Sequence, residues 1–284
     1  MPYMHLPKWD LAIGEGQPLV VIAGLNVLEG LDLAMATAAH LKAVTTELGL
    51  PFIFKASFDK ANRSSLASYR GPGLEAGLAM LAEVGARLAI PIDADLHEAG
   101  QAEAVAQVAD VVQIPAFLCR QTDLVVAAAR AAQRHGGWLH VKKGQFLAPW
   151  DAKNILDKAR EAAGGVDLTL LGERGVSFGY NNLVVDMLGI AQMQALGAPV
   201  VMDATHAVQL PGADPRTAGA STGGRREGVA VLAKAAVAAG ADAIFLEFHP
   251  EPDKALCDAP CCLPLDAAEG LLRRLKAIRS AAQA

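Results

Sequence analysis

The sequence predicts a single (β/α)8 barrel, and three observations support this fold class. First, 52% of the 284 residues are hydrophobic and only 19% are charged, which suits many parallel strands that are buried on both faces. Second, apolar runs alternate with Ala- and Leu-rich stretches roughly every thirty residues, as strands and helices do in parallel α/β folds. Third, no linker or low-complexity tract interrupts this alternation, so we expect one domain over residues 1–284.

The predicted strands are the apolar runs, most of which end where polar residues begin. They are Leu19–Val27, Pro51–Phe58, Leu88–Asp95, Val111–Phe117, Leu139–Lys143, Leu168–Gly172, Pro199–Asp203 and Ala243–Phe248. A helix that connects two strands of one sheet makes a right-handed crossover, and the two strands are then parallel. This number of strands, with short connections, favours a closed barrel over the alternative of an open, doubly wound sheet.

The predicted helices lie between these strands, and Gly49, Gly136 and Gly197 end three of them. They are Asp32–Leu48, Leu74–Ala86, Ala99–Ala109, Thr122–Gln133, Ala152–Ala163, Leu183–Leu196, Arg226–Ala239 and Asp266–Ala282. Residues 1–18 precede the first strand, and we expect them to form a small hairpin that closes the bottom of the barrel. The longest irregular segment, Gln209–Gly224, has the length of a lid or a binding loop.

Charge and composition argue against several classes of protein. The formal net charge of −5 does not suit a general nucleic-acid-binding surface. The first residues lack the basic segment and apolar core of a signal peptide, and charged residues and a glycine interrupt the most apolar stretch, residues 229–248. The four cysteines do not suit a disulfide framework. We therefore expect a soluble, cytoplasmic protein with reduced thiols, no nucleic-acid partner and no membrane span.

Polar residues gather at the carboxyl ends of the predicted strands, where the active sites of barrels lie. The opposite ends are mostly glycine, proline, alanine and other apolar residues. One polar residue at a strand end is commonplace, whereas a full ring of them indicates an enzyme. The ring comprises Asn26, Glu29, Lys55, Ser57, Lys60, Asp95, His97, Glu98, Gln113, Lys142, Lys143, Glu173, Arg174, Asp203, His206, Glu247 and His249.

The basic part of the ring includes the stretch FIFKASFDKANRSS, residues 52–65, in which three cations and three serines follow an apolar run. Lysine is a point charge, arginine a planar fork and serine a short neutral donor, so this set suits phosphate or carboxylate. A solvated basic loop is the alternative interpretation. Other strands add further cations, which indicates substrates with at least two anionic groups. The cationic cluster comprises Lys55, Lys60, Arg63, Lys142, Lys143 and Arg174.

The acidic part of the site comprises Asp95, His206, Glu247 and Asp258. Histidine, glutamate and aspartate from separate strands are able to bind a divalent metal ion. Each of these residues taken alone is more often a hydrogen-bonded structural residue. The residue types by themselves therefore leave a metal site open.

Long motifs resemble the family of 3-deoxy-D-manno-octulosonate 8-phosphate synthase, also called 2-dehydro-3-deoxyphosphooctonate aldolase. The motifs are KASFDKANRSS, VKKGQF, ERG…FGYNNLVVDM, DATHAVQLPG, GGRREGV and EFHPEP…ALCDAP, in the family's order over essentially the whole chain. The resemblance implies a (β/α)8 barrel that condenses phosphoenolpyruvate with D-arabinose 5-phosphate and water and releases phosphate. It also implies a role in lipopolysaccharide biosynthesis and a homotetramer.

The resemblance implies roles for individual residues. Residues that match those holding the carboxylate and phosphate of phosphoenolpyruvate are Lys60, Lys142 and Arg174, with Lys55, Ser57 and Gln113 nearby. Residues that match the binders of arabinose 5-phosphate are Asn62, Arg63 and Ser64. We expect Arg63 and Ser64 to hold its phosphate. The expected catalytic residues around the reacting carbons are Asn26, Lys60, Asp95, His206, Glu247 and Asp258.

One position distinguishes two branches of this family. In the metal-dependent branch, a cysteine at the end of the first strand joins a histidine, a glutamate and an aspartate as a metal ligand. Asn26 occupies that position here, and a neutral amide is a poor substitute for a soft, anionic thiolate. We therefore expect an enzyme without a metal or other cofactor. The segments IDADLHE and LHVKKGQF depart mildly from the family's pattern, which makes Asp93 and His140 doubtful contributors to the site.

Two alternative functions use the same fold. A sister synthase with another sugar phosphate, such as the heptulosonate type of aromatic biosynthesis, would keep the phosphoenolpyruvate site and differ around Asn62, Arg63 and Ser64. A catalytically silent barrel that binds a phosphosugar should have lost charged members of the ring. Every assigned member is present in this chain.

Overall fold

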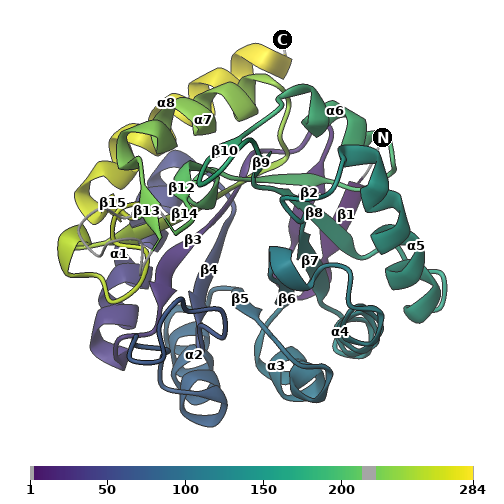
Figure 1. Ribbon diagram of the computed structural model, residues 1–284, viewed down its shortest axis with the longest axis horizontal. Coiled ribbons are helices and arrows are strands. Elements are labelled where there is room, and N and C mark those ends of the chain that lie inside the picture. The colour runs from purple at the N-terminus through teal and green to yellow at the C-terminus, as the bar shows by residue number, and fades with distance from the viewer. Residues whose placement is uncertain (1–2, 213–221, 284) are drawn as a thin grey trace.

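The computed structural model confirms the closed (β/α)8 barrel (Figure 1). It describes residues 3–212 and 222–283, and within them the barrel strands run in the order β11-β8-β7-β6-β5-β4-β3-β14. All neighbours in this ring are parallel, and β11 pairs with β14 to close it. The strands are β3 (Val20–Val27), β4 (Phe52–Ser57), β5 (Ile92–Asp95), β6 (Val111–Ile114), β7 (Trp138–Lys142), β8 (Thr169–Glu173), β11 (Val200–Asp203) and β14 (Ala243–His249).

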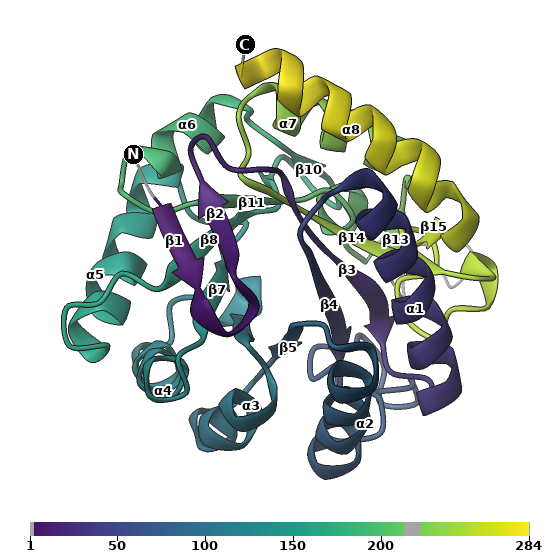
Figure 2. The same ribbon diagram turned by 180° about the vertical axis from the view of Figure 1, so that it is seen from behind.

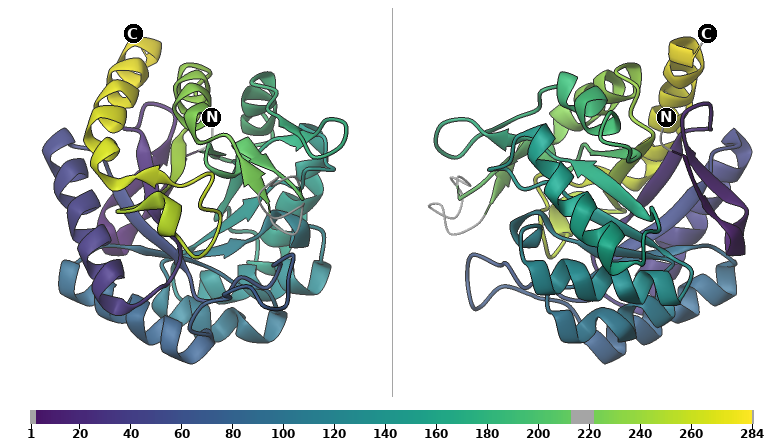
Figure 3. Two further views of the ribbon diagram at one scale, coloured as in Figure 1. Left: turned by 60° about the vertical axis from the view of Figure 1, so that its left-hand side comes forward. Right: turned by 90° about the vertical axis from the view of Figure 1, so that its right-hand side faces the viewer.

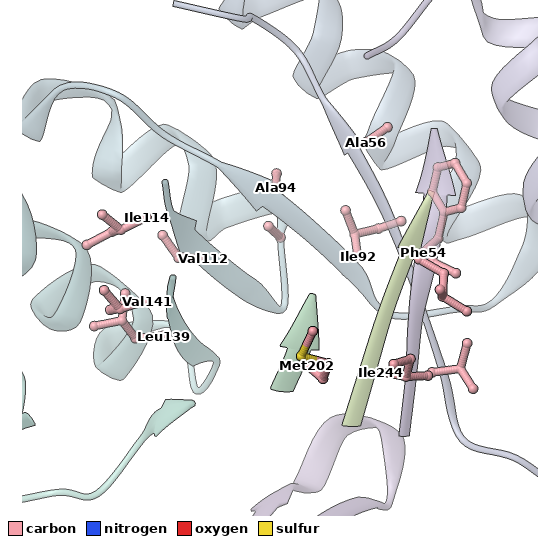
Figure 4. Packing of buried hydrophobic residues seen from close by; sticks show 14 of the residues in the cluster. Phe54, Ala56, Ile92, Ala94, Val112, Ile114, Leu139, Val141, Met202 and Ile244 are labelled. Carbon is pink, nitrogen blue, oxygen red and sulfur yellow. The ribbon is translucent and has the colours of Figure 1, made fainter. Parts of the chain in front are cut away.

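Helices surround this ring and cover its outer face. They are α1 (Leu31–Leu48), α2 (Leu74–Leu88), α3 (Ala102–Val108), α4 (Thr122–Arg134), α5 (Lys153–Ala162), α6 (Leu188–Gln194), α7 (Arg226–Ala238) and α8 (Ala268–Gln283). The outward-facing side chains of the strands, among them Phe54, Val112 and Leu139, form the main core with the helices (Figure 4). Among the described residues, no helix is long and apolar enough to cross a membrane.

A hairpin closes the bottom of the barrel, as predicted. Its strands β1 (Tyr3–Leu6) and β2 (Leu11–Gly14) pair antiparallel and lie at the face opposite the carboxyl ends of the barrel strands (Figure 2). Side chains alternate along a strand, so every second barrel residue points inward. The inward residues at the bottom, including Val20, Ile53 and Leu170, form a second apolar core with the hairpin. The bottom of the barrel is therefore closed by apolar side chains, which leaves the face at the carboxyl ends of the strands as the place for a polar site.

Short strands and long connections surround the opposite, carboxyl-terminal face (Figure 3). The strands β9 (Val176–Ser177) and β10 (Leu183–Val184) form a hairpin, and β12 (Gln209–Leu210) pairs with β13 (Gly223–Gly224). The predicted lid segment Gln209–Gly224 thus begins and ends in paired strands, while residues 213–221 lie outside the described residues. A further strand, β15 (Leu263–Pro264), extends the sheet beside β14.

Three predicted boundaries were wrong. The strand expected over Val111–Phe117 ends at Ile114, because Pro115 follows and Ala116–Leu118 form a short 3-10 helix. The helix expected over Leu183–Leu196 begins only at Leu188, because Leu183 and Val184 pair with β9 and the Asp186 side chain accepts a hydrogen bond from the Leu188 backbone N–H at 3.0 Å. Short apolar runs fit a strand as well as a helix. The strand expected from Leu88 begins at Ile92, because α2 continues through Leu88.

Candidate active site

The carboxyl ends of the barrel strands surround a cavity of about 520 Å³, a volume typical of sites for small ligands. Most of the predicted site residues lie along it, contributed by β4 to β8, by the loop after β4 and by the loops after β11 and β14. They are Lys55, Lys60, Asn62, Arg63, Ser64, Asp95, Gln113, Lys142, Arg174, His206 and Asp258.

Three predicted site residues are buried directly behind this lining. Ser57 accepts a hydrogen bond from the Lys55 ammonium at 2.6 Å, and the amide of Asn26 donates to Glu247 at 2.6 Å. Ser57, Asn26 and Glu247 are at most 4% exposed. Their contact with a substrate is therefore indirect in this conformation, through the side chains that they support.

Lys143 was predicted to belong to the cationic cluster, and the structure contradicts this. Successive residues of a strand point to opposite faces, so the inward direction of Lys142 turns Lys143 outward. The Lys143 ammonium is fully buried, donates to the Leu147 carbonyl at 3.2 Å and lies 3.5 Å from Glu173. Lys143 and Glu173 therefore form an ion pair away from the cavity, and the cluster has one cation fewer than expected.

Lys55 and Lys142 project into the barrel from β4 and β7 above the ring of Phe245. The Lys142 nitrogen lies 3.6 Å from the centroid of that ring, a distance at which the ring face attracts a cation. The same nitrogen donates to Asp203 at 2.6 Å, and the Lys55 nitrogen lies 3.2 Å from Asp95. Each buried ammonium is thus paired with a buried carboxylate.

The electrostatic surroundings separate the lysines from one another. Burial lowers the pKa of Lys142. Attraction by Asp203 acts in the opposite direction, and repulsion from Lys55 offsets part of it. Burial also acts against the charged form of Lys60, but the nearby Glu247 and Asp95 carboxylates raise its pKa above the ordinary value. Lys60 therefore holds its positive charge more firmly than Lys142 does.

The carboxylates are held in their ionised form. Burial alone would raise the pKa of Asp95, but Lys55 and a hydrogen bond from His97 bring it well below the ordinary value. Asp203 is affected in the same way by His206 and Lys142. These two carboxylates therefore remain anionic and do not serve as proton donors at neutral pH.

Two arginines extend into the cavity without a carboxylate partner among the described residues. The Arg63 guanidinium contacts only neutral acceptors, the Cys257 sulfur and the Leu256 carbonyl, and its Nε has no partner. Arg174 donates to the Gln209 side chain at 2.7 Å and to the His206 carbonyl at 3.3 Å, and its Nη1 is buried without a partner. Charged donors with unfilled hydrogen bonds are suited to bind oxyanions.

His206 connects the carboxylates on the other side of the cavity. Its Nδ1 lies 2.9 Å from Asp203, and its Nε2 lies 3.6 Å from Glu247 and 3.7 Å from Asp258. The Asn26 amide nitrogen donates to Glu247 at 2.6 Å and to Asp258 at 3.2 Å. The reverse orientation of this amide would place its oxygen against two carboxylates, so the donor must face them.

By the resemblance, Asn26 stands where the metal-dependent branch carries its cysteine ligand, and His206, Glu247 and Asp258 lie beside it. The Asn26 N–H groups point at the carboxylates, whereas a ligand to a metal would have to direct a lone pair toward the ion. Within residues 3–212 and 222–283, no three His, Cys, Asp or Glu side chains are grouped so that they could hold a metal ion.

Two residues that contact the predicted site residues carried no assigned role in the sequence interpretation. Asp203 pairs with both Lys142 and His206, and Gln209 donates to Asp258 at 2.9 Å while accepting from Arg174. Both lie in the motif DATHAVQLPG, so the motif was the available signal. The doubtful residues Asp93 and His140 lie 3.4 Å apart, fully buried and away from the cavity lining.

Comparison with known proteins agrees with this geometry. Residues 4–284 match the model of the DAHP synthetase I family. The chain is 55% identical over 274 residues to the 2-dehydro-3-deoxyphosphooctonate aldolase of Desulfosudis oleivorans. The aligned segment covers 96% of this chain and 95% of the relative. Proteins of the same name from Desulfotalea psychrophila and Syntrophotalea carbinolica are 50% and 53% identical, over 96% and 95% of this chain and 94% of each relative. The chain therefore belongs to the DAHP synthetase I family.

Proposed function

We propose that the protein condenses phosphoenolpyruvate with D-arabinose 5-phosphate and water to form 3-deoxy-D-manno-octulosonate 8-phosphate and phosphate, for lipopolysaccharide biosynthesis. The observation that carries this proposal is the pair of arginines, Arg63 and Arg174, which reach one cavity without a carboxylate partner among the described residues. Two such sites suit two substrates that each carry a phosphate. The shared name of the relatives favours the octulosonate product over a heptulosonate.

Phosphoenolpyruvate would occupy the end of the cavity formed by Lys60, Lys142 and Arg174. Lys142 and Arg174 would hold its phosphate and Lys60 its carboxylate, which directs C3 at the aldehyde of the second substrate. Attack by C3 forms the new carbon–carbon bond and leaves positive character at C2, which water captures before the C–O bond to phosphate breaks. Such positioning of two bound reactants lowers the barrier by up to about 7–11 kcal/mol. Fixed cations also stabilise the departing phosphate.

The sugar phosphate would occupy the end formed by Asn62, Arg63 and Ser64, all of which line the cavity. Arg63 and Ser64 would hold its phosphate. Asp95 and His206 line the same cavity and would place the water and move protons, with Asn26 supporting Glu247 and Asp258 behind them. Because the pKa of Asp95 is well below the ordinary value, Asp95 acts in this scheme as a hydrogen-bond acceptor.

The proposed reaction is tested by phosphate release from the purified protein. We expect release with both substrates together and none with either substrate alone. Replacing arabinose 5-phosphate with erythrose 4-phosphate distinguishes the sister synthase, which should prefer the shorter sugar. A protein that binds both substrates and releases no phosphate would be the silent barrel.

We also propose that the reaction needs no metal. The support is Asn26, whose amide donates to Glu247 and Asp258 and so stabilises the two carboxylates that a metal would otherwise neutralise. Full activity is expected after exhaustive treatment with a chelator, measured as phosphate release. A loss of activity with EDTA that added divalent metal restores would contradict this proposal. Asn26→Cys is the matched variant, in which a metal requirement should appear.

The assembly that we propose is a cytoplasmic homotetramer. Its support is a patch of exposed apolar side chains that joins the β9–β10 hairpin to the turn after β7 and to α6, which packs against residues 149–152. The patch comprises Phe146, Trp150, Phe178, Tyr180 and Leu188, each more than 60% exposed. Large exposed apolar patches mark interfaces. Sedimentation equilibrium should give four chains, and Phe178→Asp should yield smaller species.

A further inference from the structure

We propose that Glu29 is a positioning residue that holds one strap of chain, residues 250–258, against the active-site cavity, and that His249 orients Glu29. The strap follows β14 and contains a short turn, η7 (Pro252–Lys254). The proposal rests on the proposed synthase reaction, but part of its test does not require turnover.

The strap forms one wall of the cavity. Residues 255–258 line it, and two of them contact the guanidinium of Arg63 through the Leu256 carbonyl and the Cys257 sulfur. Asp258, at the end of the strap, accepts hydrogen bonds from Asn26 and Gln209. A shift of the strap would therefore move the sugar-phosphate end of the site and an expected catalytic carboxylate together.

The backbone at Asp258 also requires external support. Its φ of 48° lies in the left-handed region, where a residue with a side chain is held only by its surroundings. On its C-terminal side, the Asp258 carbonyl accepts from the Cys261 backbone N–H at 2.8 Å. On its N-terminal side, the Cys257 sulfur contacts Arg63, and the Leu256 backbone N–H donates to Glu29 at 3.0 Å.

Glu29 and His249 fix the two ends of the strap to neighbouring strands. His249 Nδ1 accepts from the Glu251 backbone N–H at 3.0 Å, so in the neutral imidazole the proton is on Nε2. That Nε2 is buried without a hydrogen-bond partner and faces the second oxygen of Glu29 at 3.6 Å, a charge–dipole contact that is longer than a hydrogen bond. The first oxygen of Glu29 holds Leu256. Because β14 pairs with β3, the strap is attached to the barrel at the ends of both strands.

Loss of the Glu29 carboxylate should loosen the wall next to Arg63 and leave the phosphoenolpyruvate end intact. For Glu29→Ala, we expect a KM for arabinose 5-phosphate raised about tenfold, the usual effect of losing a hydrogen bond to a charged group. The KM for phosphoenolpyruvate should change less than threefold, because Lys60, Lys142 and Arg174 lie outside the strap. In Glu29→Gln, the amide oxygen can still accept from Leu256 while its N–H groups face the His249 Nε2–H, so an intermediate effect is expected.

Thiol accessibility gives a readout that is independent of catalysis. Cys257 is only 4% exposed in the strap, and burial raises its pKa to about 12, so it should react slowly with a maleimide. A loosened strap should expose it, so labelling of Cys257 in Glu29→Ala should be at least about fivefold faster than in the wild type, measured by mass spectrometry. Cys119, buried elsewhere in the same chain, is the internal reference and should label at an unchanged rate.

Glu251→Ala is the matched control. It removes from the same strap an exposed carboxylate whose ion-pair partner within residues 3–212 and 222–283 is the exposed Lys254, and all values should stay within twofold of the wild type. If Glu29→Ala matches this control in KM, kcat and labelling rate, Glu29 does not position the strap. If the wild type fails to release phosphate, the proposed function fails instead, while the labelling comparison still decides about the strap. Should Glu29→Ala fail to fold, Glu29→Gln carries the same comparison.

Discussion

Arg63 and Lys142 bring positive charge to the two ends of one cavity in different ways. Among the described residues, Arg63 contacts only neutral acceptors, whereas Lys142 is bound to Asp203 at 2.6 Å and lies over the Phe245 ring. Arginine is always protonated, while a buried lysine is able to lose its proton. The two substrates should therefore respond differently to mutation and to pH.

Replacing Arg63 with alanine should affect the sugar phosphate selectively. The bidentate charged contact with its phosphate would be lost, so we expect the KM for arabinose 5-phosphate to rise by about tenfold to a hundredfold. The KM for phosphoenolpyruvate should change less than threefold. Arg70→Ala is the control, since Arg70 lies in the same loop and is paired with Asp59. Equal effects of Arg63→Ala on both substrates would refute the assignment of the two ends.

Lys142 should limit the binding of phosphoenolpyruvate at alkaline pH. Its pKa in the folded protein is lowered by burial, so its charge is lost at a lower pH than in a free lysine. The value of kcat/KM for phosphoenolpyruvate reports on the free enzyme. It should begin to fall at a pH below the ordinary lysine pKa of about 10.4. Lys60 stays charged over the same range because its pKa is raised.

The kcat profile provides the control for this pH effect. A bound phosphate stabilises the Lys142 ammonium, so the alkaline decline of kcat should move to higher pH than that of kcat/KM. Lys142→Arg keeps its charge and should lose the decline in kcat/KM, even if its rate is lower. An alkaline decline that persists in Lys142→Arg would assign it to another group.

Single residues were predictable where a motif and the strand alternation agreed. Lys55 and Lys142 follow both and line the cavity, while Lys143 shares the motif but points outward. The roles of Asp203 and Gln209 were not predictable, because each depends on contacts with residues from distant strands and loops. Charge at a strand end is visible in a sequence, whereas the partner of that charge is not.

At the scale of elements, Arg279 of helix α8 connects the bottom of the barrel to the N-terminal hairpin, and Gln283 adds one hydrogen bond to the Gln17 carbonyl. The buried Arg279 donates to the carbonyls of Ala241 at 3.1 Å, Gln17 at 3.2 Å and Gly14 at 3.3 Å, and lies 3.8 Å from Asp242. The sequence predicted both the hairpin and the helix. It did not show that Arg279 is buried, because the arginines of this helix are of a type usually found at the surface.

Arg279→Ala should destabilise the fold more than it affects the active site. It leaves the buried carbonyls and Asp242 without their shared donor, so we expect the free energy of unfolding to fall by about 3 kcal/mol. Urea unfolding at one fixed protein concentration measures this change. The exposed Arg274 on the same helix is the control, and Arg274→Ala should change the value by less than about 0.5 kcal/mol. Similar losses in both variants would show that α8 as a whole, and not Arg279, is responsible.

The start of helix α6 could not be predicted from the sequence. Its predicted start at Leu183 was wrong because LVVD follows no helix-specific period and β9 offers a strand partner. The barrel strands were predicted more reliably, since their continuous apolar runs recur between helical stretches, as is typical of parallel strands buried on both faces.

At the scale of the whole molecule, a net charge of −5 surrounds a cavity that is lined by lysine and arginine. The barrel concentrates these cations because its parallel strands all end at one face, and the fold class was therefore enough to predict where the site lies. Like charges close together destabilise the empty protein, and bound anions should relieve that repulsion. Ligand binding should thus be visible as an increase in Tm.

Phosphoenolpyruvate and arabinose 5-phosphate should each raise the Tm of the wild type. A ligand at a hundred times its Kd stabilises the folded state by about 2.7 kcal/mol, which corresponds to roughly 4–5 °C for a chain of this size. In Arg63→Ala, the shift caused by phosphoenolpyruvate should remain and the shift caused by arabinose 5-phosphate should largely disappear. Arabinose without phosphate is the control. It should give no shift, because it lacks the phosphate that Arg63 would bind. If both shifts disappeared together in Arg63→Ala, the two anions would share one site, and the separation of the cavity into two ends would be wrong.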